Sequence, residues 1–220
     1  MSDIERRYTL LMVETRARGD DRRTIGGYAA KFNQVSQNLG GFVEQVLPSF
    51  FNKSRGDGWP GVMARYNHNN DMLLGTVEGG TLRLTIDSTG LAYEVDLPAT
   101  RSDVFELVER RDVSKSSFGF RRMTVEDDWG MSDQGYPLRS LISAQMVDVA
   151  PVTDPAYLDT TAALRSLAEK MSADLDEVRS LAEQNELRKF FVRTDGPQPK
   201  SKVFGPAALL ELKAKQEPAA

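Results

Sequence analysis

The chain has 220 residues, of which 40% are hydrophobic and 27% are charged, a composition typical of a protein with one main folded domain. Its 32 acidic and 28 basic residues give a net charge of −4, which argues against a protein that binds nucleic acid through a broad basic field. It contains no cysteine and a single histidine, so disulfides, thiolate catalysis and multi-histidine metal sites are excluded.

Nothing in the sequence resembles a membrane span or a secretory signal. The longest apolar runs are only a few residues, and the N-terminal sequence MSDIERRYTL has charges where a signal peptide needs an apolar stretch. We therefore expect a cytoplasmic protein that does not cross a membrane.

The first two thirds of the chain predict β-structure. Between residue 8 and about residue 150, short runs rich in Val, Ile, Leu, Tyr and Thr alternate with Gly, Asp, Asn and Pro. Strands are expected at residues 8–13, 24–32, 42–47, 63–66, 73–78, 81–87, 91–97, 116–125 and 138–150. Gly79-Gly80 predicts a two-residue hairpin and residues 87–90 a slightly longer one, so that three strands form a meander. Residues 98–111 predict a short helix.

The pattern changes after Pro155. Residues 159–191 predict one long helix with an apolar stripe at three- and four-residue steps, and residues 194–205 have the Pro, Gly and Lys content of a linker. The stripe fits packing within the chain, a homodimer seam or a contact with a scaffold partner. We divide the chain into a β-rich domain at 1–160, a long amphipathic helix at 161–193 and a flexible C-terminal tail at 194–220.

Two segments place reactive side chains next to predicted strands. His68 follows a predicted strand in the polar sequence RYNHNND, where an imidazole would be accessible for proton transfer, although a surface-loop histidine fits the same pattern. The sequence VSKSSFGF leads three serines into a strand with a glycine, which allows close approach of a substrate to the backbone. A polar loop that opens a strand is the plainer interpretation.

A third segment, ISAQMVDVAPVTDPAY, contains a carboxylate in an apolar row. Strand alternation puts Asp148 on the same face as Ile142, Ala144, Met146 and Ala150. A buried carboxylate needs a partner because unpaired burial costs several kcal/mol. Two partners remain open at this point: the histidine, or an arginine among residues 121, 122 and 139.

The order of these motifs is similar to that of a known family. The succession GGYAAKFN, EQVLPSFF, ARYNHNND with LLGTV, LRLTIDSTGLAYEVDLPAT, SKSSFGF and VDVAPVTDPAYLDT resembles the tailed-phage prohead proteases, whose fold is related to herpesvirus assemblin. The similarity covers about residues 8 to 165. It implies an α+β fold with a mostly antiparallel, partly closed β-barrel flanked by helices.

The resemblance also implies an activity and its residues. It implies a serine endopeptidase inside the procapsid, assembled in the host cytoplasm, that digests scaffolding segments of the major capsid protein and then itself. The family histidine falls on His68, the serine on Ser117 with Ser116 as the competing assignment, and the acidic position, commonly Glu, on Asp148. Backbone amides, with help from Arg121 or Arg122, are the expected oxyanion donors.

The sequence indicates no metal, no cofactor, no membrane and no specific nucleic acid as partners, because it has no cysteine, one histidine, no long apolar run and a net negative charge. Lys200-Ser201 in the expected linker is a candidate self-cleavage site. The competing hypothesis is a non-catalytic capsid assembly or scaffolding protein with the same β-domain and helix.

Overall fold

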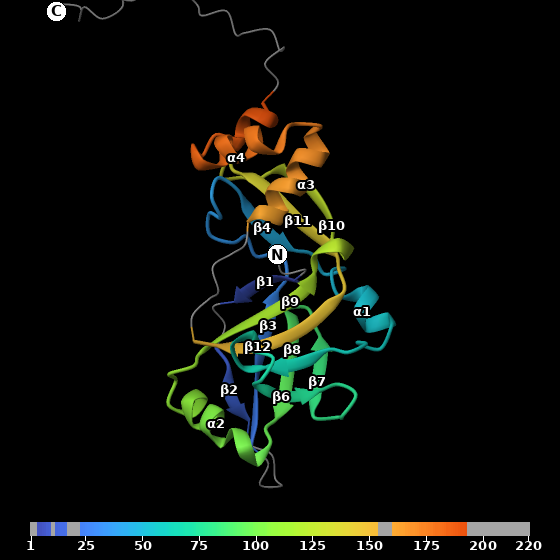
Figure 1. Ribbon diagram of the computed structural model, residues 1–220, viewed down its shortest axis with the longest axis vertical. Helices are drawn as coiled ribbons and strands as arrows, with labels where there is room; N and C mark the ends of the chain where they lie inside the picture. Colours follow the sequence, from blue (N-terminus) through green and yellow to red (C-terminus); the bar gives the residue numbers. More distant parts are fainter. Residues whose placement is uncertain (1–3, 10–11, 17–22, 154–159, 193–220) are drawn as a thin grey trace, which may run out of the picture.

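The computed structural model describes residues 4–9, 12–16, 23–153 and 160–192 of the chain. Within these residues, strands form three sheets, and helices lie at both ends of an elongated molecule (Figure 1). The predicted α+β class is therefore confirmed. No sheet in the described part of the chain closes on itself, so the predicted partly closed barrel is not confirmed.

A five-stranded sheet crosses the middle of the molecule and joins strands from distant parts of the chain (Figure 1). Its order is β1 (Ile4–Thr9), β9 (Lys115–Arg121), β12 (Met146–Val152), β5 (Met63–Arg65) and β6 (Leu73–Thr76). All neighbours are antiparallel except β12 and β5, which run parallel. β1 is an edge strand, and among the described residues it pairs with β9 alone.

A second, four-stranded sheet is entirely antiparallel. Its order is β2 (Glu14–Arg16), β3 (Thr24–Lys31), β8 (Gly90–Asp96) and β7 (Leu82–Ile86). The predicted turn between β7 and β8 is confirmed, because the backbone N–H groups of Thr89 and Gly90 donate to Asp87 Oδ1. The predicted hairpin at Gly79-Gly80 is wrong, since this turn leads from β6 in the first sheet to β7 in the second.

The two larger sheets share one hydrophobic core, whose centre is aromatic. Phe50 and Phe51, just before α1 (Asn52–Gly56), contact Phe118 and Phe120 of β9. The Phe50 and Phe120 rings lie 5.2 Å apart in an edge-to-face arrangement, which is favourable for aromatic pairs. The core therefore fixes one face of β9.

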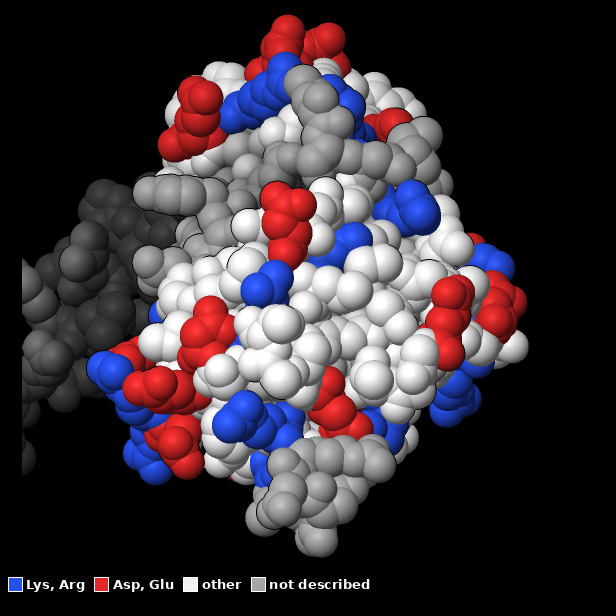
Figure 2. Space-filling model, turned by 60° about the horizontal axis from the view of Figure 1, so that its bottom comes forward, with Lys and Arg blue, Asp and Glu red and all other residues white. Residues whose placement is uncertain are grey.

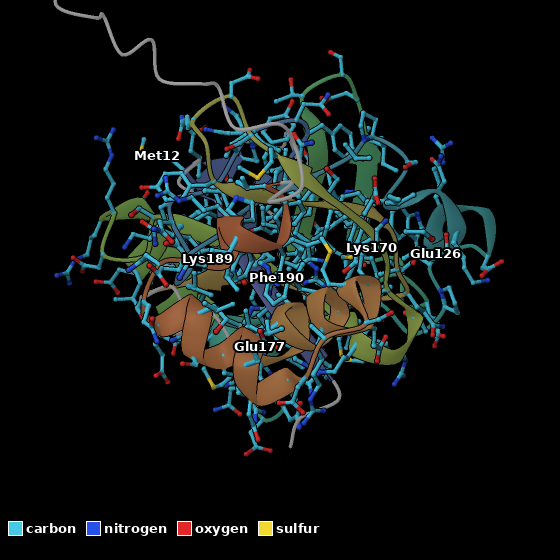
Figure 3. All side chains as sticks on the ribbon, turned by 90° about the horizontal axis from the view of Figure 1, so that it is seen from above. Met12, Glu126, Lys170, Glu177, Lys189 and Phe190 are labelled. Carbon is cyan, nitrogen blue, oxygen red and sulfur yellow. The ribbon has the colours of Figure 1, made fainter. Side chains whose placement is uncertain are left out.

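The third sheet has three strands and carries the C-terminal helices. Its order is β10 (Glu126–Met131), β11 (Pro137–Ser143) and β4 (Val43–Val46), and β11 and β4 are parallel. Figure 3 views the molecule from this end and shows α3 (Thr161–Met171) and α4 (Leu175–Glu183) above the sheets, with Lys170 on α3 and Glu177 on α4. Their apolar side chains form a second core with Phe42 and Trp129.

The remaining helices are short. α2 (Ser102–Glu109) confirms the helix expected within residues 98–111 and packs against β2 and β3 at the opposite end of the molecule. The 3-10 helices are η1 (Tyr66–His68), η2 (Ala99–Arg101), η3 (Arg122–Thr124) and η4 (Leu187–Phe190).

The prediction of one long helix at 159–191 is wrong. α3 ends at Ser172, which has a left-handed φ of 51°, and α4 begins after Asp174, whose carboxylate accepts the N–H groups of Asp176 and Glu177. The apolar residues of the predicted stripe lie on two helices, α3 and α4, that share one core. Leu164, Leu167 and Val178 are therefore buried within the chain. These side chains are therefore not free to form a homodimer seam. The predicted tail, residues 194–220, lies outside the described residues.

Candidate active site

His68 lies in a short loop whose backbone conformation is unusual. It ends η1, directly after β5, and both Asn67 and His68 have left-handed φ angles, of 52° and 55°. The Asn67 side-chain oxygen accepts hydrogen bonds from the backbone N–H of Thr153 at 3.0 Å and from its hydroxyl at 3.3 Å. This contact ties the histidine loop to the end of β12. His68 is only 8% exposed, so the accessible loop expected for it is not what the structure shows.

The two candidate serines of β9 point to opposite faces of the sheet. Ser116 is fully buried, and its Oγ lies 3.0 Å from the hydroxyl of Tyr93 in the main core. Ser117 shares the other face with Gly119 because side chains alternate along a strand. Its register partners are Tyr8 on β1 and Ala150 on β12, and its side chain faces the histidine loop.

Asp148 on β12 is paired with Gly119, and its side chain lies on the face of the sheet where a Cβ of residue 119 would project. The carboxylate is 1% exposed. A Cβ added at Gly119 would lie 2.4 Å from Asp148 Oδ1, closer than real Cβ contacts come. The glycine therefore leaves the space that the carboxylate occupies.

Among the three predicted residues, His68 is in direct contact with both of the others. His68 Nδ1 lies 2.9 Å from Asp148 Oδ1, and His68 Nε2 lies 2.6 Å from Ser117 Oγ. With neutral histidine, donation of Nδ1–H to the carboxylate leaves Nε2 free to accept the serine proton. The backbone carbonyl oxygen of Arg7 lies 2.9 Å from the same Oγ, and because the hydroxyl has a single proton, this carbonyl and His68 Nε2 are alternative acceptors for it.

The carboxylate also binds an arginine that the sequence analysis did not identify. Arg65 Nη1, on β5, lies 3.1 Å from Asp148 Oδ2. Burial raises the pKa of Asp148, but the hydrogen bond from His68 and the charges of His68, Arg65 and Arg6 outweigh it and hold the pKa below its usual value. Asp148 is therefore ionised at neutral pH. The parallel pairing of β5 with β12, which no local pattern predicts, brings Arg65 to this position.

The arginines considered from the sequence are elsewhere. Arg139 is buried on β11, where it contacts Glu5, Glu44 and Asp127. Arg121 and Arg122 lie where β9 ends and η3 begins. Both predicted classes of partner for Asp148, a histidine and an arginine, are present, but the arginine is a different residue.

A pocket of about 250 Å³ is lined in part by Arg7, Tyr8 and Thr9 of β1. It is lined by residues of β1, β3 and β4, by the segment 34–39 and by Phe118, but Ser117 is not part of its lining. Within the part of the chain that the structure describes, no group of three or more His, Cys, Asp and Glu side chains is placed to hold a metal ion.

Comparison with known proteins identifies the family of the chain. Residues 11–174 match the family model described as caudovirus prohead serine protease, which spans most of the chain. No significant match was found among curated proteins or among solved structures. Because this match covers well over half of the chain, the chain belongs to the family of caudovirus prohead serine proteases.

Proposed function

We propose that this serine protease uses Ser117 as nucleophile, His68 as general base and Asp148 to orient the histidine. The observation that carries the proposal is the unbroken chain of contacts from Asp148 Oδ1 through the imidazole to Ser117 Oγ, at 2.9 and 2.6 Å. Serine, histidine and carboxylate triads are defined by this geometry, whatever their order in the sequence. Ser116 is disfavoured because its hydroxyl contacts Tyr93 in the core.

The contacts support a two-step hydrolysis. As Ser117 Oγ bonds to the scissile carbonyl carbon, its proton moves to His68 Nε2 and the carbonyl electron pair moves to oxygen. The C–N bond then breaks, the imidazolium gives its proton to the leaving amine, and an acyl-enzyme remains. A water molecule then bonds to the acyl carbon as it gives a proton to the same nitrogen. The C–Oγ bond breaks, the imidazolium returns the proton to Ser117 Oγ, and the carboxylic acid is released. Asp148 accepts the Nδ1–H throughout, which stabilises the imidazolium.

The proposed substrates are scaffolding segments of the phage major capsid protein and the chain itself, inside the procapsid. The family description, which names the prohead, supports this assignment. None of the described helices is long and apolar enough to span a membrane. Figure 2 shows a face on which basic and acidic side chains are interspersed around an uncharged area, which gives no basic field for nucleic acid on that face.

Time-resolved intact-mass analysis tests the assignment. Wild type, Ser117→Ala and Ser116→Ala would each be incubated with and without co-expressed capsid protein. We expect discrete cleavage products from wild type and Ser116→Ala and none from Ser117→Ala. Products from Ser117→Ala would remove Ser117 as nucleophile. If wild type produced no cleavage even with capsid protein, a non-catalytic assembly role would replace the proposal.

A further inference from the structure

Four charged side chains are buried together on the core side of β1. The charged cluster consists of Glu5 and Arg7 on β1, Glu44 on β4 and Arg139 on β11, and all four are more than nine-tenths buried. Two positive and two negative charges balance within it. Buried charges of this kind require partners, and these residues provide them for one another.

The contacts within the charged cluster link two sheets. Arg7 binds both carboxylate oxygens of Glu44 and lies 2.8 Å from Glu5 Oε2. Arg139 Nη1 lies 3.1 Å from Glu44 Oε2 and 3.2 Å from Glu5 Oε2. Each carboxylate therefore contacts both guanidinium groups, one from the five-stranded sheet and one from the three-stranded sheet.

Arg7 and Glu44 keep their charges within the charged cluster. Burial lowers the pKa of Arg7, but the carboxylates of Glu44 and Glu5 outweigh burial and raise it. Burial raises the pKa of Glu44, but Arg7 and Arg139 outweigh burial and lower it. The cluster is an ion-pair network at neutral pH.

Arg7 connects the charged cluster to the nucleophile. Its guanidinium lies within the cluster, and Nη1 also donates to the carbonyl oxygen of Arg6 at 2.8 Å, which stiffens β1 locally. Its own carbonyl oxygen accepts the Ser117 hydroxyl at 2.9 Å on the other side of the sheet. β1 is an edge strand, and among the described residues only one strand pairs with it, so pairing alone restrains it weakly.

We propose that the charged cluster is a positioning element for the reaction: it fixes the Arg7 carbonyl and so keeps the Ser117 hydroxyl within reach of His68. The inference rests on the proposed function of Ser117. A displacement of about 1 Å at a reacting group costs as much as 100-fold in rate, so a small shift of β1 is sufficient to matter. Arg7, Glu44 and Arg139 are positioning residues, because their side chains do not touch the reacting atoms.

Stability alone is a weak reason for such a cluster. Replacement of a buried ion-pair network by apolar residues of similar volume is often neutral or stabilising, whereas ionic contacts restrict geometry. The double variant Glu44→Leu with Arg139→Met removes one charge of each sign and leaves Arg7 paired with Glu5. This double variant distinguishes a stabilising role of the charged cluster from a positioning role. Only a positioning role predicts a variant that stays folded but has a displaced Ser117 hydroxyl.

The readouts do not depend on the natural substrate. Diisopropyl fluorophosphate phosphorylates a reactive serine: the Oγ–P bond forms, fluoride leaves, and the serine proton passes to the base. Mass spectrometry of the intact protein measures this addition, and Ser117→Ala serves as the unreactive control. Because His68 is the only histidine, 15N-histidine labelling gives ring signals from His68 alone and reports its contact with Ser117 directly.

The matched control removes an ion pair far from the site. Arg83 forms a two-point contact with Asp96 on neighbouring strands of the four-stranded sheet, at 2.7 and 2.9 Å, and Arg83→Met breaks it. We expect the double variant to remain folded and to react with the reagent between about 10-fold and 100-fold more slowly, with His68 Nε2 shifted toward its signal in Ser117→Ala. The control should retain the wild-type reaction rate and His68 signals.

The outcomes separate this inference from the proposed function. A folded double variant with the wild-type reaction rate and wild-type His68 signals would overturn the positioning role. If the double variant does not fold, the isosteric Glu44→Gln is judged by the same two readouts, and failure of that variant to fold would assign the cluster a purely structural role. Wild type that never reacts at Ser117 would contradict the proposed function, and the His68 signals would still decide the effect of the cluster.

Discussion

At the scale of single residues, Asn67 determines where His68 lies. A left-handed conformation costs an ordinary residue about 1–2 kcal/mol, and asparagine tolerates it better because its side chain hydrogen-bonds locally. Here the side-chain oxygen bonds to Thr153 at the end of the strand that contains Asp148. One side chain therefore sets the distance between base and carboxylate.

Asn67→Ala is expected to slow the Ser117-dependent cleavage by about 10-fold or more, since the loop loses its tie to β12 and the imidazole shifts. Asn67→Asp keeps an oxygen acceptor and should retain more activity. Peptide cleavage rates under single-turnover conditions measure both. The control in the same loop is Asn69→Ala, because the Asn69 side-chain oxygen accepts the N–H of Asp71 within the loop itself. Equal rates for wild type and Asn67→Ala would contradict this role.

The ionised Asp148 makes stability depend on pH in a defined direction. Its pKa lies below the ordinary value of about 3.9, so the carboxylate stabilises the fold above that pH and the contribution is lost as the pH falls through the lowered pKa. Asp148→Asn should lower the free energy of unfolding by about 1–3 kcal/mol at neutral pH. It should reduce cleavage less than Ser117→Ala or His68→Ala does.

Urea unfolding of wild type and Asp148→Asn at pH values of about 7, 5 and 3 measures this difference. The difference in free energy of unfolding between wild type and Asp148→Asn should be the same at the two higher pH values and smaller at the lowest pH. Asp57→Asn is the control, because the ion pair of Asp57 with Lys53 is exposed. A stability difference between wild type and Asp148→Asn that grows on acidification would refute the ionised, paired carboxylate.

The sequence identified the site residues to different degrees. A single histidine left no other candidate, and Asp148 was identifiable as a carboxylate in an apolar row. Without the resemblance, the sequence could not show whether Ser116 or Ser117 is the candidate nucleophile. A shift of one residue in the predicted strand reverses which of the two serines faces the core. Arg65 was missed since its contact depends on two strands that are far apart in the sequence.

At the scale of elements, strands with clear alternation were predicted within a few residues, and irregular ones were not. β3, β5, β7 and β8 lie within the expected ranges to about one residue at each end. The strand expected at 138–150 is two strands, β11 and β12, separated at Ala144 and Gln145. β10 was missed because its sequence, EDDWGM, has a single large apolar side chain facing the core.

The first strand was predicted too late in the chain. It was expected at 8–13 because Tyr8 to Val13 is apolar, whereas β1 covers Ile4–Thr9. Its inward residues are Glu5 and Arg7, which a hydrophobic pattern assigns to solvent. Glu5 and Arg7 can be buried because they pair with charged residues of the three-stranded sheet, and no local signal in the sequence reveals that pairing.

The contact between β9 and β12 leads to a prediction about glycine. Gly119→Ala places a methyl group where Asp148 Oδ1 now lies, so the carboxylate must move away from His68. We expect cleavage to fall by about 10-fold or more while the fold is kept. Gly130→Ala on β10 is the matched control, because an added Cβ there meets nothing within 4 Å. Steady-state rates and far-UV circular dichroism measure the two effects, and an unimpaired Gly119→Ala would refute the steric argument.

At the scale of the whole molecule, the C-terminal helices belong to the fold. α3 and α4 cover Phe42 and Trp129, which are 0% and 6% exposed. The indole N–H of Trp129 also donates to Ser166 on α3, whose hydroxyl contacts Asp127. The three-stranded sheet that lies under these helices provides two members of the charged cluster, so the helices and the active site are connected through it.

A chain that ends at residue 160 should therefore be less stable and less active. Exposure of the second core is expected to increase binding of a dye for apolar surfaces and to lower the urea midpoint. The reaction of Ser117 with diisopropyl fluorophosphate should slow as well. Leu164→Ala tests the same core in the full-length chain. A truncated chain that is stable, binds no dye and reacts normally would show that the helices are dispensable.

The topology of the five-stranded sheet affects when activity arises during synthesis. His68 and Asp148 are 80 residues apart in the chain, and Ser117 lies 110 residues from Arg7. The active site therefore requires strands from nearly the whole β-rich region, and pairings between such distant strands form slowly. A nascent chain still attached to the ribosome has no assembled nucleophile until β12 has emerged. Under the proposed function, a chain released from the ribosome before Asp148 has been made is therefore inactive as a protease.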